Sequence, residues 1–581
     1  MCSLGVMRLV QGKANPYGAA DAAVYLLHGD ATAGPITRIV PAAGGALPVG
    51  TRRPNQPVRI KLLHLNDLHG RIAVLSRLAA WLQAMRRRHA ADPHVIVLAV
   101  TTGDESGGHL SDLLLGHSLA AHQTHPGYRL LSLAGIDLGV PGNHDLDLGT
   151  ATLARACDQE ASFPVLAANV TDAPALAERC PAAVIVVARG VRIGCIGLTT
   201  PGQVHPEPYS RRRIADPVTT AAHLLPALRP LCDVLIVLSH LGLSLNQRSA
   251  VVSAAGDVEL ARSLPPGGVH LIVGGHTHSA LNEAGLSAEN IVNGIPIVQA
   301  GKFGQFVGEV EIHIGDTVEV VDARLHPTLD LPNDALFEQA HVQPLLAQIE
   351  AQRQRVLGSV AADADLSADA VRTHFAAGES ALANFIADAL VYGCRAAGHN
   401  VDLAIVDASS VHDGLQPGQV VTLGDWFGVM PFPDVVCLLR LTGRQLEALV
   451  RDNALRVERP GEPHTERGFL HFSAGVRYAI RLGPTREMAD AEGITVDGRP
   501  IAAWHARDFV VAAASFLRGP AAVWEAHVGG RLPRPLFDLM SVPRAYTGLR
   551  VRDLLLDHIA AQGGILPESG ARRDGRVRVL T

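Results

Sequence analysis

Five separate segments of the chain place Asp, His or Asn side chains where an apolar stretch ends. These residue types supply the oxygen and nitrogen donors that divalent metal ions take in proteins. The segments are LNDLHG, TTGDESGG, PGNHDLDLG, DVLIVLSH and VGGHTHS, and their candidate ligands are Asp67, His69, Asp104, Asn143, His240, His276 and His278. This mixed donor set predicts a metal centre.

The spacing within the first two segments indicates how the ligands would be shared. Asp67 and His69 are two residues apart, and on an extended chain such side chains point to the same side, so one metal could take both. Asp104 lies among glycines, which let the backbone approach closely and leave the carboxylate free to bridge two ions. A bridging carboxylate would make the centre binuclear.

The later segments complete the set. Asn143 offers an uncharged amide oxygen, a hard ligand that suits a divalent ion beside charged neighbours. His240 ends an apolar run, while His276 and His278 are expected to present two imidazoles from one extended segment. The donor types suit Zn, Mn, Fe, Co or Mg and do not choose among them.

Each motif also has an ordinary structural explanation. An Asp-x-His pair at a strand end is often a turn, an Asn-His-Asp run can be a hydrogen-bonded turn, and His240 alone could be a core histidine. The chain has 27 histidines, so most of them serve no metal. The occurrence of all five segments, each after an apolar run, favours the metal centre over separate structural roles.

The segments that must position these ligands alternate in type. Apolar runs at 61–65, 94–100, 184–188, 191–198, 233–240 and 269–276 predict strands, whereas residues 72–85 carry apolar side chains at helical spacing. Several of these runs end directly in the candidate ligands. Ligands commonly gather where strands meet loops, so an α/β (α+β) fold with a site at the strand ends is expected.

Four regions are expected along the chain. Residues 1–57, rich in Gly, Ala and Pro, read as an N-terminal extension with poor order. Residues 58–331 form the first domain, and the mixed apolar and charged stretch within 332–357 is a helical connector. Residues 358–581 form a second domain with its own helix and buried strand.

Composition narrows the function classes. With 581 residues, 48% of them hydrophobic, a net charge of −6 and a pI near 6.5, the chain offers no basic surface for nucleic acid or anionic membranes, and a small polar substrate fits better. Seven cysteines without CxxC pairing argue against a disulfide framework and a cysteine zinc site, so reduced thiols are expected. Nothing indicates the oligomeric state.

No export signal or membrane span is visible in the sequence. The amino terminus lacks a positive start followed by a long apolar run, and no stretch of about 18 apolar residues occurs. The protein is therefore expected to be soluble and cytoplasmic as written, and periplasmic if the true start differs.

The motifs LHLNDLHGR, GNHDLDLG, SHLG, GGHTHS and PIVQAGKFGQFVGEV, with the Gly-Asp pair at 103–104, resemble the calcineurin-like metallophosphoesterases. Within that family they are similar to the bacterial 5′-nucleotidase and 2′,3′-cyclic-nucleotide phosphodiesterase group. The resemblance implies a four-layer α/β/β/α domain followed by a smaller α/β nucleotidase C-terminal domain, which sets substrate specificity.

The resemblance also implies roles for the candidate residues. One divalent metal ion would be held by Asp67, His69, Asp104 and His278, and a second by Asp104, Asn143, His240 and His276. His144, oriented by Asp147, would act on the phosphate as the catalytic pair rather than bind metal. A protonated imidazole there could stabilise phosphoryl charge or donate a proton to the leaving oxygen.

The carboxyl half resembles the nucleotidase C-terminal domain, with two departures. Phe472 and Phe516 match the aromatic positions that hold a base, although both could be core residues. DASSVH (407–412) replaces an Asn-Gly-Gly-Arg signature, so His412 stands where arginine is expected and the bidentate grip on an oxyanion is absent. The family's Gly-Gly-Asp-Gly turn is also missing.

The expected function is a binuclear metal-dependent hydrolase of phosphate esters, and first among these a 5′-nucleotidase that releases phosphate from nucleoside monophosphates. Cleavage of a cyclic nucleotide or of a nucleotide sugar is the alternative within the same chemistry. A non-catalytic binding or scaffold protein is the alternative from another class, motivated by the altered DASSVH segment.

Overall fold

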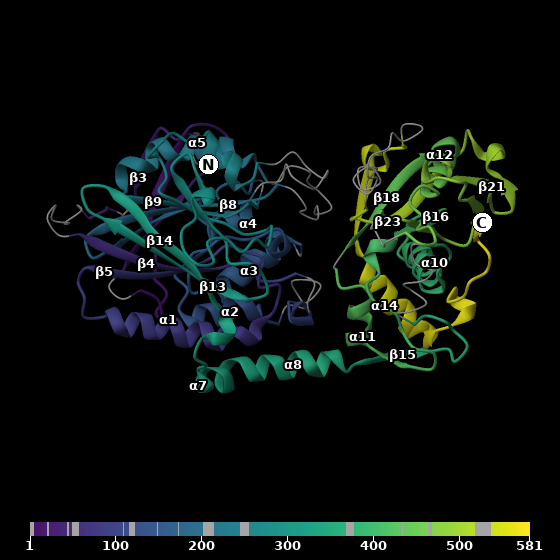
Figure 1. Cartoon of the computed structure of the whole chain (residues 1–581), viewed down its shortest axis with the longest axis horizontal. Helices are drawn as coiled ribbons and strands as arrows, with labels where there is room; N and C mark the ends of the chain where they lie inside the picture. Colours follow the sequence, from purple (N-terminus) through teal and green to yellow (C-terminus); the bar gives the residue numbers. More distant parts are fainter. Residues whose placement is uncertain are drawn as a thin grey trace. The chain divides into compact units, whose positions relative to one another are not determined.

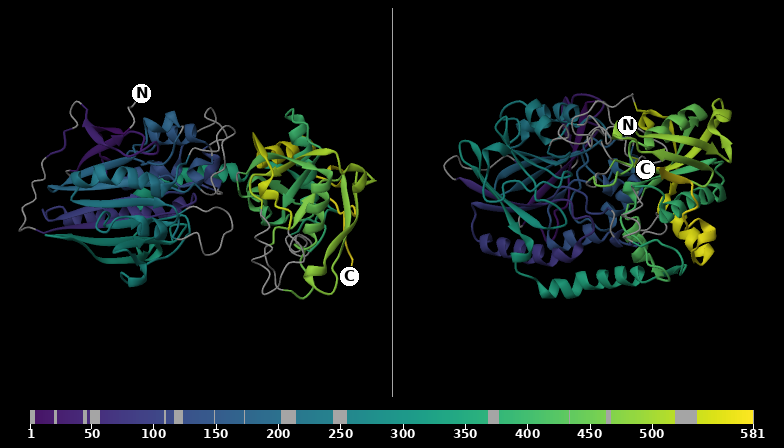
Figure 2. Two further views of the ribbon diagram at one scale, coloured as in Figure 1. Left: turned by 90° about the horizontal axis from the view of Figure 1, so that it is seen from above. Right: turned by 45° about the vertical axis from the view of Figure 1, so that its right-hand side comes forward.

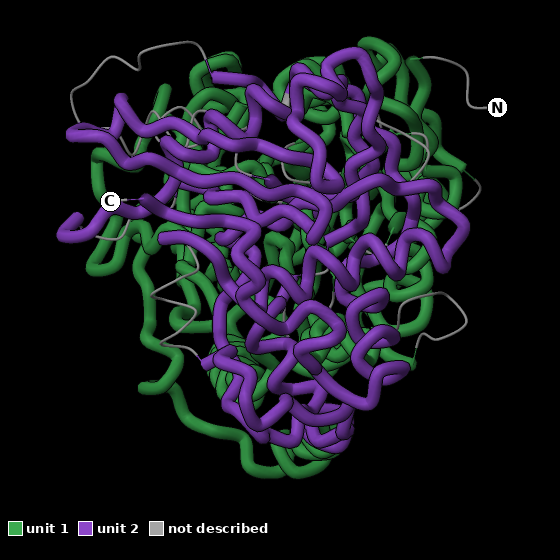
Figure 3. The backbone as a smooth tube through the Cα atoms, turned by 90° about the vertical axis from the view of Figure 1, so that its right-hand side faces the viewer, with its two compact units in different colours: residues 1–204, 210–349 green, residues 205–209, 350–581 purple. Residues whose placement is uncertain are grey.

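The chain forms two compact units, which divide between Ile349 and Glu350 and are coloured green and purple in Figure 3. The computed structural model describes residues 5–19, 22–42, 46–48, 57–107, 110–115, 123–147, 149–171, 173–201, 214–243, 255–367, 377–432, 434–462, 467–517 and 536–580. The candidate metal ligands all lie in unit 1, so each unit is described by itself.

A five-stranded sheet in unit 1 carries the first ligand segments, in the order β14-β13-β4-β5-β6. Strands β4, β5 and β6 are parallel, and β13 runs antiparallel to β4. The strands are β4 (Val58–Leu65), β5 (Val95–Thr101), β6 (Leu138–Gly139), β13 (Phe306–Ile314) and β14 (Val318–Pro327). The carboxyl ends of β4, β5 and β6 therefore meet at one edge.

A nine-stranded sheet carries the later ligand segments, in the order β11-β12-β10-β9-β8-β7-β2-β1-β3. Here β8, β9, β10 and β12 are mutually parallel along the sheet. The strands are β1 (Val6–Gln11), β2 (Ala23–His28), β3 (Arg38–Pro41), β7 (Ala183–Ala188), β8 (Val191–Thr199), β9 (Val234–His240), β10 (Leu271–Val273), β11 (Ile291–Val292) and β12 (Ile295–Val298).

The two sheets pack face to face between helical layers (Figure 1). Ile60 of β4 and Ile236 of β9 share one buried cluster, which fills the space between the sheets. Leu63 packs with helix residues on the outer face of the five-stranded sheet, and Val237 does so on the other outer face. The helices are α1 (Leu75–His89), α2 (Pro126–Ala134), α3 (Thr150–Gln159) and α4 (Pro174–Ala177) on the first side, and α5 (Pro217–Leu228) and α6 (Asp257–Ser263) on the second. This arrangement confirms the mixed α/β class and its four layers.

The N-terminal region differs from the extension expected for residues 1–57. Its strands β1, β2 and β3 belong to the nine-stranded sheet, where β2 pairs with β7. These N-terminal strands are drawn in purple at the start of the colour scale in Figure 2. Asn15 donates from Nδ2 to the carbonyl oxygens of Ser132 and Ile136 at 2.9 and 2.7 Å, which fastens the β1–β2 connection to unit 1. Strands β1 and β2 are short, and the segments around them are rich in Gly, Ala and Pro. The composition of residues 1–57 therefore did not indicate these strands.

The core between β4 and β13 contains a close contact that yields a stability prediction. His64 is 1% exposed and lies opposite Gly308, and a Cβ added at Gly308 would stand 2.0 Å from His64 Nε2. Gly308→Ala is therefore expected to lower the free energy of unfolding of unit 1 by about 1–3 kcal/mol, because an extra methyl must displace a buried ring. Denaturant unfolding monitored by circular dichroism measures the change.

Gly315, between β13 and β14, serves as the matched control. A Cβ built there meets no atom within 4 Å, so Gly315→Ala is expected to leave the unfolding midpoint unchanged. An equal loss of stability in both variants would show that the His64 contact is not the cause.

Unit 2 contains three small sheets, in the orders β19-β16-β23-β18-β24, β22-β21-β20-β26 and β17-β15-β25. Its strands are β15 (Val356–Val360), β16 (Leu403–Asp407), β17 (Val420–Thr422), β18 (Val435–Thr442), β19 (Leu470–Phe472), β20 (Val476–Arg481), β21 (Asp490–Val496), β22 (Arg499–Pro500), β23 (Asp508–Ala514), β24 (Arg544–Arg550), β25 (Gly564–Ile565) and β26 (Val577–Leu580). The longer helices are α10 (Ala381–Ala396), α11 (Leu423–Val429), α12 (Gly443–Asn453) and α14 (Val551–Gln562).

The stretch expected to be a helical connector, 332–357, is helical in the structure and packs partly on unit 1. It contains α7 (Ala335–Phe337) and α8 (Gln343–Arg353). Leu345 and Ile349 of α8 are buried in the same cluster as α1 and α2, so the first half of this stretch packs on unit 1. Among the described residues, no helix combines the length and the apolar character needed to cross a membrane.

Candidate metal centre

The candidate ligands lie where the carboxyl ends of strands from both sheets come together. Asp67 follows β4, Asp104 follows β5, and His240 is the last residue of β9. Thr102, next to β5, joins the two sheets here. Its Oγ1 donates to the carbonyl oxygen of Gly274 at 2.8 Å, and its own carbonyl oxygen lies 2.6 Å from His240 Nδ1. Loops of both sheets thus surround one site.

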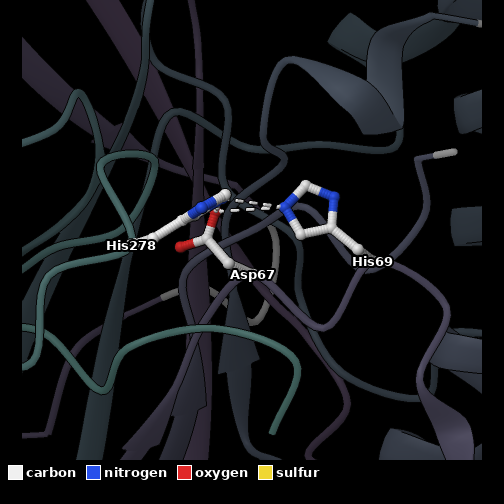
Figure 4. Close-up of side chains that lie close together, drawn as sticks. All are labelled: Asp67, His69 and His278. Atoms are coloured by element: carbon white, nitrogen blue, oxygen red, sulfur yellow. Dashed lines mark hydrogen bonds and ion pairs between the residues drawn. The ribbon is translucent and has the colours of Figure 1, made fainter. Parts of the chain in front are cut away.

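One group of ligand atoms consists of Asp67, His69 and His278 (Figure 4). Asp67 Oδ1 lies 3.7 Å from His69 Nε2 and 3.5 Å from His278 Nε2, and these two nitrogens are 3.1 Å apart. The three side chains point toward one another in Figure 4 although His278 comes from a distant part of the chain. Such a set of one carboxylate and two imidazoles suits a divalent cation.

A second group consists of Asp104, His240 and His276. Asp104 Oδ2 lies 3.2 Å from His240 Nε2, and the same oxygen lies 3.9 Å from His69 Nε2 of the first group. The carboxylate of Asp104 therefore stands between the two groups, which is the position that a bridging ligand requires.

The backbone at these ligands is strained. Asp67, His69, Asp104, His276 and His278 have φ values of 54°, 46°, 56°, 77° and 57°, in the left-handed region that non-glycine residues rarely adopt. Each such residue costs on the order of 1–3 kcal/mol, and they cluster at functional sites. The expectation that the Asp67–His69 and His276–His278 pairs lie on extended chain is therefore wrong, since tight turns aim these side chains.

Glycines provide the space that these turns need. A Cβ at Gly142 would stand 2.0 Å from Asp104 Oδ1, and one at Gly103 would stand 2.8 Å from His240 Nδ1. At Gly107, whose φ is 122°, it would meet His144 Cβ at 2.6 Å. The glycines flanking Asp104 and Asn143 thus allow the close backbone approach predicted from the sequence.

The electrostatics of the centre favour added positive charge. Burial raises the pKa of Asp104, but His240 and His144 outweigh it and hold this pKa well below its usual range. Burial lowers the pKa of His240, but Asp104 outweighs burial and raises it to about 9. A buried carboxylate is thus kept ionised among imidazoles, where a cation can replace their protons.

His240 shows that the donor set fits a metal. Its Nδ1 faces the Thr102 carbonyl oxygen, which assigns a proton to Nδ1, and its buried Nε2 is turned toward Asp104 Oδ2 at 3.2 Å. An imidazole oriented by a backbone carbonyl, with the other nitrogen turned into a cluster of ligands, is the usual arrangement of a metal-binding histidine.

His144 pairs with Asp147 beside the centre. Its Nδ1 lies 2.7 Å from Asp147 Oδ2, and its backbone N–H donates to Asp104 Oδ1 at 2.8 Å. Burial lowers the pKa of His144, but Asp147 and Asp104 outweigh it and raise this pKa to about 10. A ring nitrogen of His144 also groups with His69 and Asp104, so a protonated imidazole lies at the edge of the ligand cluster.

Asn143 is buried with 1% exposure, next to His144 at the start of the short helical turn His144–Leu146. Its carboxamide as a ligand of the second metal stays a prediction from the sequence.

Asn66 and Asp145 support the site and were missed by the sequence analysis. Asn66 Nδ2 donates to Asp67 Oδ2 at 2.6 Å, which orients that carboxylate. Asp145 accepts backbone N–H groups of Gly142 and Asp104 at 2.9 Å each, and so joins the two ligand loops. Their only signal in the sequence was that they lie next to Asp67 and His144, and a polar residue in such a position ordinarily faces solvent.

Phe303, which the sequence did not single out either, lies beside the first ligand group together with two cationic side chains. Its ring centroid lies 5.6 Å from that of His69 and 6.2 Å from that of His278, and its φ is 57°. Lys302 Nζ lies 4.9 Å and Arg71 Cζ 5.4 Å from the same ring. Among the described residues, neither cation has a recorded ion pair. A positive rim therefore borders the first ligand group.

The proposed base-binding residues of unit 2 do not form one site. Phe472 is fully buried in the core of unit 2, with its ring 5.9 Å from Tyr478, so it presents no face to a base. That expectation is wrong, because β19 turns Phe472 inward. Phe516 is 43% exposed, and His412 is exposed with its ring 5.4 Å from Phe432.

Comparisons with known proteins agree with the two-unit structure. Residues 60–280 match the family Calcineurin-like phosphoesterase, and residues 356–525 match the family 5′-nucleotidase, C-terminal domain. The chain is 26% identical to Protein UshA of Yersinia enterocolitica over 432 residues, which cover 67% of this chain and 75% of that protein. It is 24% identical to Endonuclease YhcR of Bacillus subtilis over 68% of this chain, but spans only 33% of that longer protein.

A solved structure shows the same fold. The putative 5′-nucleotidase from Staphylococcus aureus, solved in complex with alpha-ketoglutarate, superposes with a TM-score of 0.62 at 17% identity, covering 90% of this chain and 99% of that one. Residues 60–280 are thus similar to the calcineurin-like phosphoesterases, and residues 356–525 are similar to the C-terminal domain of 5′-nucleotidases.

Proposed function

We propose that the protein is a binuclear metal-dependent hydrolase of phosphate esters and that its substrates are nucleoside monophosphates, which makes it a 5′-nucleotidase. The observation that carries the proposal is the pair of ligand groups, Asp67, His69 and His278 beside Asp104, His240 and His276, with the Asp104 carboxylate between them. The nucleotide preference is supported by the match of residues 356–525 and by relatives named 5′-nucleotidase.

The residues of the candidate metal centre would take different roles in the reaction. Two divalent cations, when bound, would supply Lewis-acid stabilisation of the phosphoryl group and of the attacking oxygen. Asp104 would bind both cations, and Asn66 would hold the Asp67 carboxylate in place. His144, kept protonated by Asp147, would donate a hydrogen bond to the phosphate and a proton to the leaving oxygen.

The test is a substrate panel with varied metals. Purified protein with Mn, Co, Zn, Fe or Mg is expected to release inorganic phosphate and nucleoside from nucleoside monophosphates. A folded, metal-loaded protein that hydrolyses no phosphate ester would contradict the proposal and support the binding or scaffold alternative. Release of a monoester from a cyclic nucleotide or a nucleotide sugar, without attack on monophosphates, would establish the diesterase alternative instead.

The positive rim beside Phe303 yields a prediction about substrate binding. Replacing both Lys302 and Arg71 by Met is expected to raise KM for a nucleoside monophosphate roughly 3- to 10-fold at low ionic strength, with kcat changed less than about 2-fold. The two cations border the site and attract an anionic ester, so the KM effect should shrink in high salt.

Lys13, an exposed residue between β1 and β2, serves as the control. Lys13→Met combined with Arg38→Met, at an exposed position of β3, removes the same two charges from unit 1 at the far part of the nine-stranded sheet and is expected to leave KM unchanged. Equal KM shifts in both variants would indicate an effect of net charge, which would refute a local role of the rim.

A further inference from the structure

Two thiols in unit 1 lie against each other. Cys157 Sγ and Cys180 Sγ are 3.6 Å apart, although 23 residues separate them in the chain. Cys157 lies in the last turns of α3 and is half-buried, whereas Cys180 follows α4 and is 4% exposed.

Neighbouring contacts hold the two segments in this position. Asp158 and Arg179, the residues next to the two cysteines, form an ion pair with a distance of 3.0 Å between Oδ1 and Nη1. The backbone N–H of Cys180 donates to the Leu176 carbonyl oxygen at 2.6 Å, and Leu176 is buried in the core beside α3. The ion pair and the buried Leu176 side chain therefore hold the two segments that carry the sulfur atoms next to each other.

We propose that Cys157 and Cys180 form an intramolecular disulfide in the presence of a small-molecule disulfide such as oxidised glutathione, and that this bond clamps α3 to the segment after α4. A disulfide needs the sulfurs at about 2.05 Å, so the observed separation must shorten by roughly 1.5 Å. Side-chain rotation supplies a change of this size without moving either helix. The disulfide contains no metal ligand and no substrate-binding residue, so this proposal does not depend on the proposed function.

The exchange proceeds in two balanced steps. The thiolate of Cys157, the less buried of the two residues, attacks one sulfur of the small-molecule disulfide, forms a mixed disulfide and releases one small thiol. The Cys180 thiolate then attacks Cys157 Sγ, forms the intramolecular bond and releases the second small thiol. Two protein thiols are oxidised, one small disulfide is reduced to two thiols, and the two protons leave on those thiols.

The environment sets the rate of this exchange. The contact with Cys180, together with burial, raises the pKa of the Cys157 thiol well above its usual range. Because the thiolate is the reacting species, the exchange is slow at neutral pH and faster at alkaline pH. The bond should therefore accumulate under sustained oxidising conditions and not during brief exposure.

The consequence lies in the stability of unit 1. The bond closes a loop that contains α4 and the chain leading from α3 to β7, which reduces the entropy of the unfolded chain. For a loop of this length we expect the unfolding temperature of unit 1 to rise by about 5–10 °C. The helix α3 begins three residues after Asp147, so the clamp also stiffens the element that follows the catalytic pair.

The experiment uses the full chain. Folded protein is incubated with oxidised glutathione at pH 8.5, its free thiols are alkylated, and it is digested with trypsin without reduction. Cleavage after Arg155, Arg179 and Arg189 places the two cysteines in separate peptides, 156–179 and 180–189. We expect these peptides to appear linked, two hydrogens lighter than their sum, with an unfolding temperature that returns to its starting value when dithiothreitol is added.

Matched variants separate the pair from general oxidation. Cys157→Ser and Cys180→Ser are each expected to lose both the linked peptide and the rise in unfolding temperature, while Cys232→Ala, at another buried thiol of unit 1, keeps both. Folded wild-type protein that gives only a glutathione adduct, no linked peptide, or a linked peptide without a rise in unfolding temperature would overturn the proposal.

Discussion

Asp104→Asn is expected to reduce kcat/KM for a nucleoside monophosphate by on the order of 10³-fold or more and to lower the bound metal content. The carboxylate lies 3.2 Å from His240 Nε2 and 3.9 Å from His69 Nε2, so it contacts both ligand groups. Asparagine keeps the size of the side chain but loses the charge and offers only one oxygen. The measurements are steady-state kinetics and elemental analysis of the purified variant.

Asp92, at the opposite end of the same strand, is the matched control for Asp104. It precedes β5, and its side chain is 36% exposed in a pair with Arg59 at 3.4 Å. Asp92→Asn is expected to leave activity and metal content close to those of the unaltered protein. An Asp104→Asn variant with full activity and full metal content would exclude this carboxylate as a bridging ligand.

His144→Asn is expected to lower kcat by about 10²- to 10⁴-fold while the metal content stays unchanged. The imidazole has its Nδ1 2.7 Å from Asp147 Oδ2, which leaves Nε2 to act on the phosphate. Asp147→Asn removes the charge that keeps the imidazole protonated, so it should lower kcat by a smaller factor of roughly 10 to 100. Steady-state kinetics combined with metal analysis distinguishes His144 and Asp147 from the metal ligands, because only the loss of a ligand should lower the metal content.

Two comparisons test the assignment of the pair. The double variant should be little slower than His144→Asn alone, because Asp147 acts through His144. His313→Asn, at a 45% exposed position of β13, should leave kcat unchanged. Loss of metal from His144→Asn would instead make His144 a ligand, as its grouping with His69 and Asp104 allows.

The chemistry of the site was readable from the sequence because metal ligands are few, chemically distinctive and placed at strand ends. Asp67, Asp104 and His240 each follow an apolar run that forms a buried strand, and strand ends converge in any layered sheet. The mixed α/β class followed from the same alternation of strands and helices. Residue type and order therefore determined the fold class and the kind of site.

Several features depended on contacts between distant segments and could not be read locally. The strands of residues 1–57 exist because β2 pairs with β7, some 160 residues away, and composition alone concealed them. Likewise, Phe472 is an aromatic residue at a plausible position, but the pairing of β19 with β16 decides that its ring faces the core.

The sequence by itself determined which donors the candidate metal centre contains: the carboxylates and imidazoles that follow its strands. Only the tertiary structure decided how they are aimed. Left-handed turns at Asp67, His69 and Asp104, possible because glycines leave room for them, place the donors in two neighbouring groups with the Asp104 carboxylate between them. Local sequence specifies which side chains are present, whereas their convergence depends on strand pairing and packing across two sheets.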